Sequence, residues 1–443
     1  MRTLTLIFNP IAGARNPHAF FWRKFDLKYA PFENDKRGIV RIMKNHRRNT
    51  LAALLGAASL NVFAQTPPGA IPLGPLMAYP EIEVGIKRDS NIALQPDATK
   101  QADTITSVKP GVRIEAKQGA NVYDVSYRGE YLRYNQQTTD NVENHDFGAN
   151  ANMTFDARNN LKLRLQHADR VDPRGSLPSV TTPTPNEYRQ ASATGLYTYG
   201  AEDAQGRLEF QGGFNTKSYV NNRASTANLD QDRTDLGGVF LWRVQPKTYA
   251  TFTLRQSDYH YTTAGTTLVD SKDRFYLVGV RWDATALTSG RFSLGRQTKK
   301  FESAGPQNFS GTSWEGGVNW KPLSYSSVDF STKRNTTDST GLGDFGINQS
   351  NQAVWNHAWT SSISSALTGG YTTDRFSRGV PAAGTTGGAD RSDKTTTLGL
   401  RINYAIQRWL KAGADYTNTA RDSNDSNSDY KRNVLMFFLS ATL

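Results

Sequence analysis

Residues 398–406 read LGLRINYAI, and every second residue of this stretch is apolar. The apolar positions alternate with Gly399, Arg401, Asn403 and Ala405. Successive side chains of a β-strand point to opposite faces, so the alternation predicts a strand with one apolar face and one polar face.

The same period of two recurs from about Tyr79 to the C-terminus, whereas helical i, i+3, i+4 spacing does not recur there. It is clear in VRIEAK (112–117), YDVSYRGEY (123–131) and LKLRL (161–165), and again in the last stretch, NVLMFFLSATL (433–443). We therefore predict an all-β fold whose strands separate an apolar from a polar environment.

The expected connections between these strands alternate between short and long. Short ones fall near 118–119, 158–160, 201–206, 245–247, 286–289, 322–324, 361–362 and 407–408. Long ones fall near 89–104, 135–145, 169–187, 220–233, 262–273, 302–311, 335–349, 376–393 and 421–430. Eight short and nine long connections predict 18 strands, with 16 as the alternative. Short periplasmic turns and long extracellular loops are typical of a transmembrane, antiparallel, up-and-down β-barrel.

Strands of soluble β-sandwiches and β-propellers also alternate apolar and polar residues. A sandwich has no reason to separate short from long loops so regularly. A propeller would show a repeated blade motif, and none is found here. Tryptophan placement favours a membrane as well. Five tryptophans lie within a few residues of the short turns, where amphipathic rings meet lipid headgroups: Trp242, Trp282, Trp320, Trp359 and Trp409.

Composition excludes several classes of protein. The mean hydropathy of −0.59 argues against a helical membrane protein, which needs apolar runs of about 20 residues. The net charge of +12 is concentrated in residues 1–64, which carry +8, so the rest of the chain carries only +4. A nucleic-acid partner therefore loses its main support. Cysteine is absent, which fits passage through an oxidising periplasm without a disulfide framework.

Residues 43–64, MKNHRRNTLAALLGAASLNVFA, have the pattern of a secretory signal peptide. Lys44, Arg47 and Arg48 precede a short apolar run, and small residues at Val62 and Ala64 predict cleavage before Gln65. Residues 1–42 show no period, and we expect them to be an untranslated or unstructured upstream extension, with translation starting at Met43. Residues 65–78 are rich in Pro and Gly and predict a periplasmic tether. Residues 79–443 then form the outer-membrane barrel.

Two segments carry a family resemblance: EVGIKRDSNI (83–92), a short segment after the leader, and the tail SDYKRNVLMFFLSATL (428–443). With the barrel layout of residues 79–443, they resemble the β-barrel porin 2 family, whose members are outer-membrane proteins often encoded with exopolysaccharide biosynthesis and export genes. The resemblance implies an outer-membrane location in a Gram-negative bacterium and a role in polysaccharide export. It brings no catalytic motif.

A barrel of 16 to 18 strands leaves an aqueous lumen, so the polar strand face should line a pore. By alternation, the basic residues expected on it are Arg113, Arg128, Lys162, Arg164, Arg243, Arg255, Arg281, Arg291, Arg401 and Lys411. The acidic residues expected there are Glu115, Asp124, Glu130, Glu209, Glu315, Asp329 and Asp415. The charges could compensate one another or form a basic ladder for polyanions, and a cluster of Arg113, Lys162 and Arg164 on neighbouring strands would favour the ladder.

The third long loop, 169–187, contains four prolines and could fold inward, in which case Asp172 and Arg174 would line a constriction. A solvated surface loop is the alternative. No histidine or cysteine cluster has metal-ligand spacing, and none of the histidines lies in a known barrel-hydrolase motif. We therefore expect neither a cofactor nor enzymatic activity.

Three functions stay open on these grounds. The chain could be a conduit or accessory for exopolysaccharide export with a partly basic hydrated lumen, a general or anion-preferring diffusion porin, or a non-conducting surface or structural barrel. Expected partners are outer-membrane lipid, the barrel-insertion machinery, and either anionic polysaccharide or small solutes.

Overall fold

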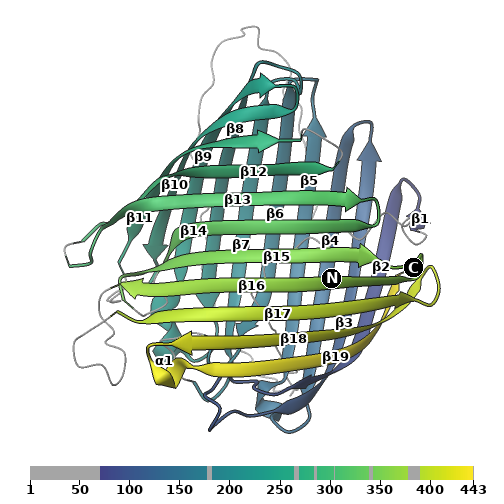
Figure 1. The fold of residues 1–443 in the computed structure, drawn as a ribbon, viewed down its shortest axis with the longest axis vertical. Coiled ribbons are helices and arrows are strands. Elements are labelled where there is room, and N and C mark those ends of the chain that lie inside the picture. The colour runs from purple at the N-terminus through teal and green to yellow at the C-terminus, as the bar shows by residue number, and fades with distance from the viewer. Residues whose placement is uncertain are drawn as a thin grey trace, which may run out of the picture. The chain divides into compact units, whose positions relative to one another are not determined.

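The computed structural model describes residues 70–176, 182–263, 269–283, 287–303, 305–338, 343–377 and 390–442. The predicted upstream extension and signal peptide lie outside these residues. Within them, eighteen long antiparallel strands, β2 to β19, pair with their neighbours in chain order. The sheet closes into a barrel because β19 also pairs with β2. Figure 1 shows strands of the C-terminal half crossing in front of the N-terminal strands, as opposite walls of this barrel.

The barrel strands are β2 (Leu76–Asp89), β3 (Asp103–Gln118), β4 (Asn121–Tyr134), β5 (Val142–Thr154), β6 (Asn159–Asp172), β7 (Asn186–Tyr199), β8 (Gly206–Tyr219), β9 (Gln231–Gln245), β10 (Thr248–Tyr261), β11 (Ser271–Trp282), β12 (Thr288–Phe301), β13 (Phe309–Leu323), β14 (Ser326–Asp338), β15 (Phe345–Ala358), β16 (Ile363–Ser377), β17 (Ser392–Ala405), β18 (Leu410–Ser423) and β19 (Tyr430–Thr442). Eight short and nine long connections join them, which confirms the predicted strand count. We call the two ends of the barrel the short-turn end and the long-loop end.

Short helical segments lie in three of the long loops: η1 (Thr138–Asp140), α1 (Arg223–Thr226) with η2 (Ala227–Leu229), and η3 (Ser426–Ser428). None of the helices in the described ranges has the length and apolar character needed to cross a membrane.

The wall of the barrel alternates as the sequence predicts, with apolar residues on its outer face and polar residues on its inner face. Leu398, Leu400 and Ile402 are 55%, 40% and 44% exposed on the outer face, and Phe437 in β19 is 61% exposed. The register places Arg401 on the other face, directly opposite Asp415 of β18. A continuous belt of exposed apolar side chains is unstable in water, because it leaves apolar surface hydrated, and it is the surface that a lipid-spanning barrel presents.

Tryptophan placement also follows the prediction. Trp242, Trp320, Trp359 and Trp409 are 45%, 49%, 57% and 47% exposed, and all lie beside short turns. Trp355 joins Trp359 in an aromatic group, with ring centroids 6.2 Å apart. The short-turn end therefore has an outward aromatic girdle of the kind found at membrane interfaces.

The start of the first barrel strand differs from the expectation of a tether reaching residue 78. β2 begins at Leu76, and β1 (Ile71–Leu73) folds back on it, with Leu73 opposite Leu76. Gly74 makes this turn possible, because its φ of +62° suits a residue without a side chain. Leu76 to Ala78 also pair with β3, so the partners on both sides make these residues part of the sheet.

Candidate functional site

All ten basic residues predicted for the lumen lie on the inner face of the wall. Their ladder partners on adjacent strands are inward-facing residues, and most of the residues that flank them in sequence are apolar residues of the outer face. Arg164, for example, lies between the exposed Leu163 and Leu165 and pairs across the sheet with Asn150. Alternation alone was sufficient for this placement.

Five of the ten are in ion pairs. Arg128, Arg255, Arg281 and Arg401 lie 2.9, 2.8, 2.6 and 3.0 Å from carboxylate oxygens of Glu81, Glu315, Glu209 and Asp415, and Arg113 pairs with Glu115. Three of these arginines also rest on rings of the wall: the guanidinium groups of Arg113, Arg255 and Arg401 lie 4.0, 4.8 and 4.8 Å from the ring centroids of Tyr79, Phe275 and Phe438. Their charge is therefore largely compensated within the wall.

The other five form no ion pair within the part of the chain that the structure describes. Arg164 donates from Nε to the Asn150 amide oxygen at 3.1 Å, a neutral partner. All five lie within a few residues of a short turn; they are Lys162, Arg164, Arg243, Arg291 and Lys411. Among the ten predicted basic residues, those without an ion pair therefore lie at the short-turn end.

The cluster considered from the sequence, Arg113 with Lys162 and Arg164, does not form across neighbouring strands. Arg113 lies in β3 and the other two in β6, with β4 and β5 between them. A different basic group exists on β8 to β12, and it includes Arg207, which the sequence analysis missed. Arg207 is the second residue of β8, and the same alternation that placed Glu209 on the inner face also places Arg207 there.

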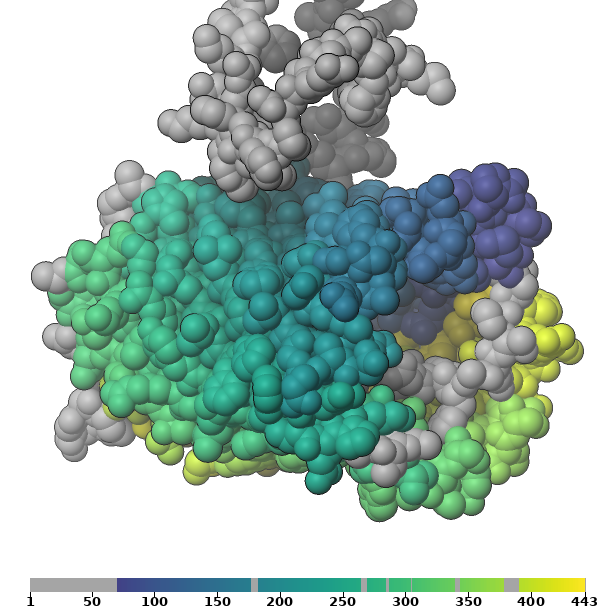
Figure 2. Space-filling model, turned by 90° about the horizontal axis from the view of Figure 1, so that it is seen from above, coloured from purple at the N-terminus to yellow at the C-terminus, as the bar shows by residue number. Residues whose placement is uncertain are grey.

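A hollow opens in the lumen between the first and last parts of the barrel (Figure 2). It has a volume of about 670 Å³ and is lined by Glu83, Lys109, Arg128, Arg401 and Lys411, among other residues of β2 to β4 and β15 to β19. Its walls carry mostly paired charges, since Lys109 is 2.8 Å from Glu83.

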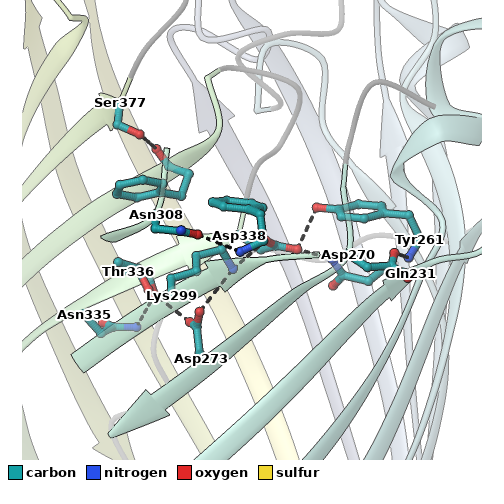
Figure 3. A network of polar contacts seen from close by, with 12 residues as sticks. Gln231, Tyr261, Asp270, Asp273, Lys299, Asn308, Asn335, Thr336, Asp338 and Ser377 are labelled. Carbon is teal, nitrogen blue, oxygen red and sulfur yellow. Dashed lines mark hydrogen bonds and ion pairs between the residues drawn. The ribbon is translucent and has the colours of Figure 1, made fainter. Parts of the chain in front are cut away.

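The long-loop end of the inner wall is filled by buried, paired charges. Lys299 is fully buried and lies 2.9 Å from Asp338 and 3.3 Å from Asp273 (Figure 3). Tyr261 donates to Asp338 at 2.6 Å, and Gln231 also donates to it. The network joins side chains from β9, β10, β11, β12 and β14, so it ties a third of the wall together at this end.

The two residues predicted for a constriction have separate partners. Asp172 stays on the inner wall at the end of β6, where it accepts hydrogen bonds from Lys217 at 3.2 Å and Tyr219 at 2.6 Å. Arg174 instead reaches two other loops: its Nη2 lies 2.7 Å from Asp140 and 3.2 Å from the Gln101 side chain. Asp172 and Arg174 have different partners because the register of β8 against β7 brings Lys217 and Tyr219 within reach of Asp172.

Arg174 belongs to a packed group of three loops. Gly175 approaches the carbonyl of Ala93 so closely that a side chain there would clash. Ile92 and Ala93 are buried against Ile105, Leu132 and Val142, which face inward by register. The loop after β2 therefore folds over the inner wall, and the loop after β6 packs on it. Residues 177–181 of the predicted constriction loop lie outside the described residues.

Burial is the main influence on the Asp140 carboxyl in the loop after β4. It raises the pKa of Asp140 above the usual value, although Arg174 acts in the opposite direction. Loss of Arg174 would leave this buried carboxyl without a cation, so the ion pair helps to hold the loop after β6 against the loop after β4.

Replacement of Arg174 by alanine is expected to release these loops. Truncation of one partner of a buried, hydrogen-bonded ion pair costs about 2–5 kcal/mol, so about 3 kcal/mol would shift the balance between packed and released loops roughly a hundredfold. The measurement is single-channel recording, in which Arg174→Ala should increase the mean current.

The matched control is Lys100→Ala, which removes an exposed ion pair with Asp97 in the same group of loops. Its current should equal that of the unmodified protein. If Arg174→Ala, and a deletion of residues 174–184, both leave the current unchanged, the loops do not narrow the lumen.

A closed antiparallel barrel with an apolar outer belt, an aromatic girdle and a charged inner wall defines a porin-like outer-membrane β-barrel. The sequence adds the particular family. Residues 66–442 match the family described as "Putative beta-barrel porin 2", and the chain belongs to it.

Several solved structures are similar to the chain at low sequence identity. The FrpB iron transporter of Neisseria meningitidis (F5-1 variant, apoprotein form) is 12% identical, with a TM-score of 0.45 over 78% of this chain and 61% of that one. This chain thus spans about three fifths of the transporter. Pseudomonas aeruginosa OpdL is 10% identical, with a TM-score of 0.45 over 84% and 99% of the two chains. OccK2 (OpdF) of the same organism, in complex with glucuronate, is 11% identical, with a TM-score of 0.44 over 83% and 98%. No curated protein sequence matches the chain.

Proposed function

We propose that this protein is an outer-membrane pore for anionic carbohydrate, acting as a conduit or accessory in exopolysaccharide export. The observation that carries the proposal is the distribution of charge along the inner wall. Of the ten predicted basic side chains, the five without ion-pair partners lie near short turns, whereas Lys299, Arg391 and Arg432 near the long-loop end are paired with carboxylates. The chain belongs to the β-barrel porin 2 family, and the role in polysaccharide export that the resemblance to this family implies supports the carbohydrate.

The arrangement supports export of an anionic polymer. Short turns of outer-membrane barrels face the periplasm, so an exported polymer meets the basic end first. Positive charge between low-dielectric walls raises the local concentration of anions and lowers the barrier to their passage. The proposed mechanism is passive passage, with no cofactor and no bond made or broken. The proposed partners are outer-membrane lipid, the insertion machinery and the anionic polymer.

An anion-preferring diffusion porin is the second candidate, and the water-accessible hollow of about 670 Å³ favours it. The same basic end would then serve small anions rather than a polymer. A non-conducting surface barrel is the third, and the packed loops after β2, β4 and β6 favour that one.

Recording from residues 65–443 in a planar bilayer tests the proposal. Under a KCl gradient we expect a reversal potential that indicates a severalfold preference for chloride over potassium. An anionic oligosaccharide added at the short-turn side should block the current, whereas a neutral oligosaccharide of equal length should not. Anion preference without block would favour the diffusion porin. Absence of current from a barrel whose unheated form migrates as folded would overturn the pore.

A deletion strain tests the cellular role. Loss of secreted polymer with unchanged uptake of small solutes is the expected result. The reverse, normal polymer and impaired uptake, would contradict the export role and leave the porin.

A further inference from the structure

Four arginines converge on the inner wall near the short-turn end of β8 to β12. Tyr249 of β10 lies opposite Arg243 on one side and Arg281 on the other, and Arg281 lies directly opposite Arg291. The Arg207 guanidinium lies 5.9 Å from the ring centroid of Tyr249. We call Arg207, Arg243, Arg281 and Arg291 the arginine arc.

The arc is unfavourable for the folded barrel by itself. Like charges directly opposite each other in a sheet are destabilising, and Arg281 and Arg291 form such a pair on one face. Arg207 Nε is buried and has no hydrogen-bond partner among the described residues. A buried donor without an acceptor costs free energy. An anion bound beside Arg281 and Arg291 would reduce the repulsion within that pair.

One carboxylate already occupies part of the arc. Glu209 accepts from both terminal nitrogens of Arg281, at 2.6 and 3.0 Å. This bidentate geometry is what a guanidinium offers to any carboxylate. Within the arc, Arg281 is therefore paired with a carboxylate of the chain itself. The guanidinium groups of Arg243 and Arg291 have no carboxylate partner among the described residues.

The surroundings are rigid and leave room. The Tyr249 hydroxyl donates to the Glu202 carbonyl at 2.5 Å, which fixes the ring between the arginines. The inward-facing neighbour of Arg291 on β13 is Gly317, and a Cβ placed there would come no closer than 3.7 Å to any atom. The wall beside Arg291 therefore has no side chain to obstruct a ligand.

We propose that the arginine arc is a binding site for carboxylate-bearing sugar units, such as the uronic acids of an acidic polysaccharide. The choice of a sugar as the ligand rests on the proposed function. The existence of an anion site rests on the geometry of the arginine arc. Binding at the short-turn end would retain the acidic units of a polymer as it enters the lumen, with each unit exchanging carboxylate contacts among Arg243, Arg291 and Arg207.

The test compares two double variants that remove the same charge. Arg243→Gln with Arg291→Gln alters the arc, and Lys162→Gln with Arg164→Gln alters unpaired basic residues of β6 at the same end. The probe is a galacturonic acid oligomer, titrated into the detergent-solubilised barrel by calorimetry and into the bilayer recording. Loss of charge-assisted hydrogen bonds in the arc variant should raise Kd about tenfold or more. The β6 variant should change Kd less than about twofold, because distant charges are screened.

The outcomes separate the site from the pore. Binding that weakens only in the arc variant supports the site. If the same barrel carries no current, the proposed function is contradicted but the site is not. Equal weakening in both variants overturns the site and leaves a general basic lumen. Inorganic phosphate competing as well as the uronate would overturn the carboxylate-sugar specificity. Absence of binding to the unmodified, folded barrel would also overturn the site, whatever its conductance.

Discussion

Replacement of Lys299 by methionine is expected to lower the free energy of unfolding of the barrel by about 3–5 kcal/mol, because it leaves buried carboxylates without a cation. Lys299 is 0% exposed, and its partners Asp273 and Asp338 are 2% and 12% exposed. Methionine fills a similar volume without charge. The measurement is the denaturant or thermal midpoint of the refolded barrel in detergent, followed by the mobility shift between unheated and heated samples.

The expected loss of stability is large because several other groups contact the members of this ion pair. The ammonium lies 4.4 Å from the centroid of the Tyr259 ring, which attracts a cation through its face. Thr336 donates to Asp273 at 3.0 Å, and Tyr261 donates to Asp338. Without Lys299, two carboxylates would remain close together in a poorly hydrated site, and these neutral donors cannot balance both charges.

Lys272→Met is the matched control, since it lies next to Asp273 on the same strand and ends in an exposed ion pair. Lys272 is 2.6 Å from Glu302, and the two side chains are 44% and 50% exposed. Such surface pairs contribute about 0–1 kcal/mol, so this variant should unfold close to the unmodified protein. Equal midpoints for Lys299→Met and Lys272→Met would contradict the structural role of the network.

The barrel itself could be predicted from the sequence because its information is local. Leu398, Leu400 and Ile402 face lipid regardless of which strands lie beside them, so a period of two reveals the outer face directly. The inner placement of Arg401 follows from the same phase. Turn and loop lengths, also local, were sufficient for the strand count.

The buried networks were beyond prediction because their members come from separate strands. Alternation places Lys299 on the inner face and Lys300 on the outer face, but nothing in the sequence marks Lys299 as buried within the lumen. Its partners arrive from β11 and β14, at heights that only the strand register determines. Arg174 shows the same limit, since the sequence placed it with Asp172, while the folded loops place it against Asp140.

The seam between β19 and β2 carries the second large effect. Its ladder joins Val434–Thr442 to Glu81–Asp89, and the long-loop end of the seam is held by side chains. Asp89 accepts from Arg432 at 2.5 and 3.1 Å, and Asn91 donates to the Lys431 carbonyl at 3.2 Å. The two segments on which the family resemblance rests, DSN within 83–92 and KRN within 428–443, therefore meet where the barrel closes.

Replacement of Asp89 by alanine is expected to destabilise this closure by about 3–5 kcal/mol, since it leaves the Arg432 guanidinium without its carboxylate. Asp89 is 1% exposed and also accepts from the Asn91 backbone at 3.0 Å, so the change removes a turn contact as well. The ladder of β19 with β2 joins strands from opposite ends of the barrel sequence, and no connecting turn holds them together. The yield of heat-modifiable barrel after refolding should fall sharply, together with the unfolding midpoint.

Two further variants identify the cause. Asp97→Ala removes the exposed ion pair with Lys100 in the loop after β2 and should refold like the unmodified protein. Asp89→Asn keeps an acceptor for Arg432 and for the backbone but loses the charge, so its midpoint should lie between the two. If Asp89→Ala refolds as well as Asp97→Ala, the ladder alone closes the barrel. In that case the contacts at the seam would not explain why the family resemblance rests on these two segments.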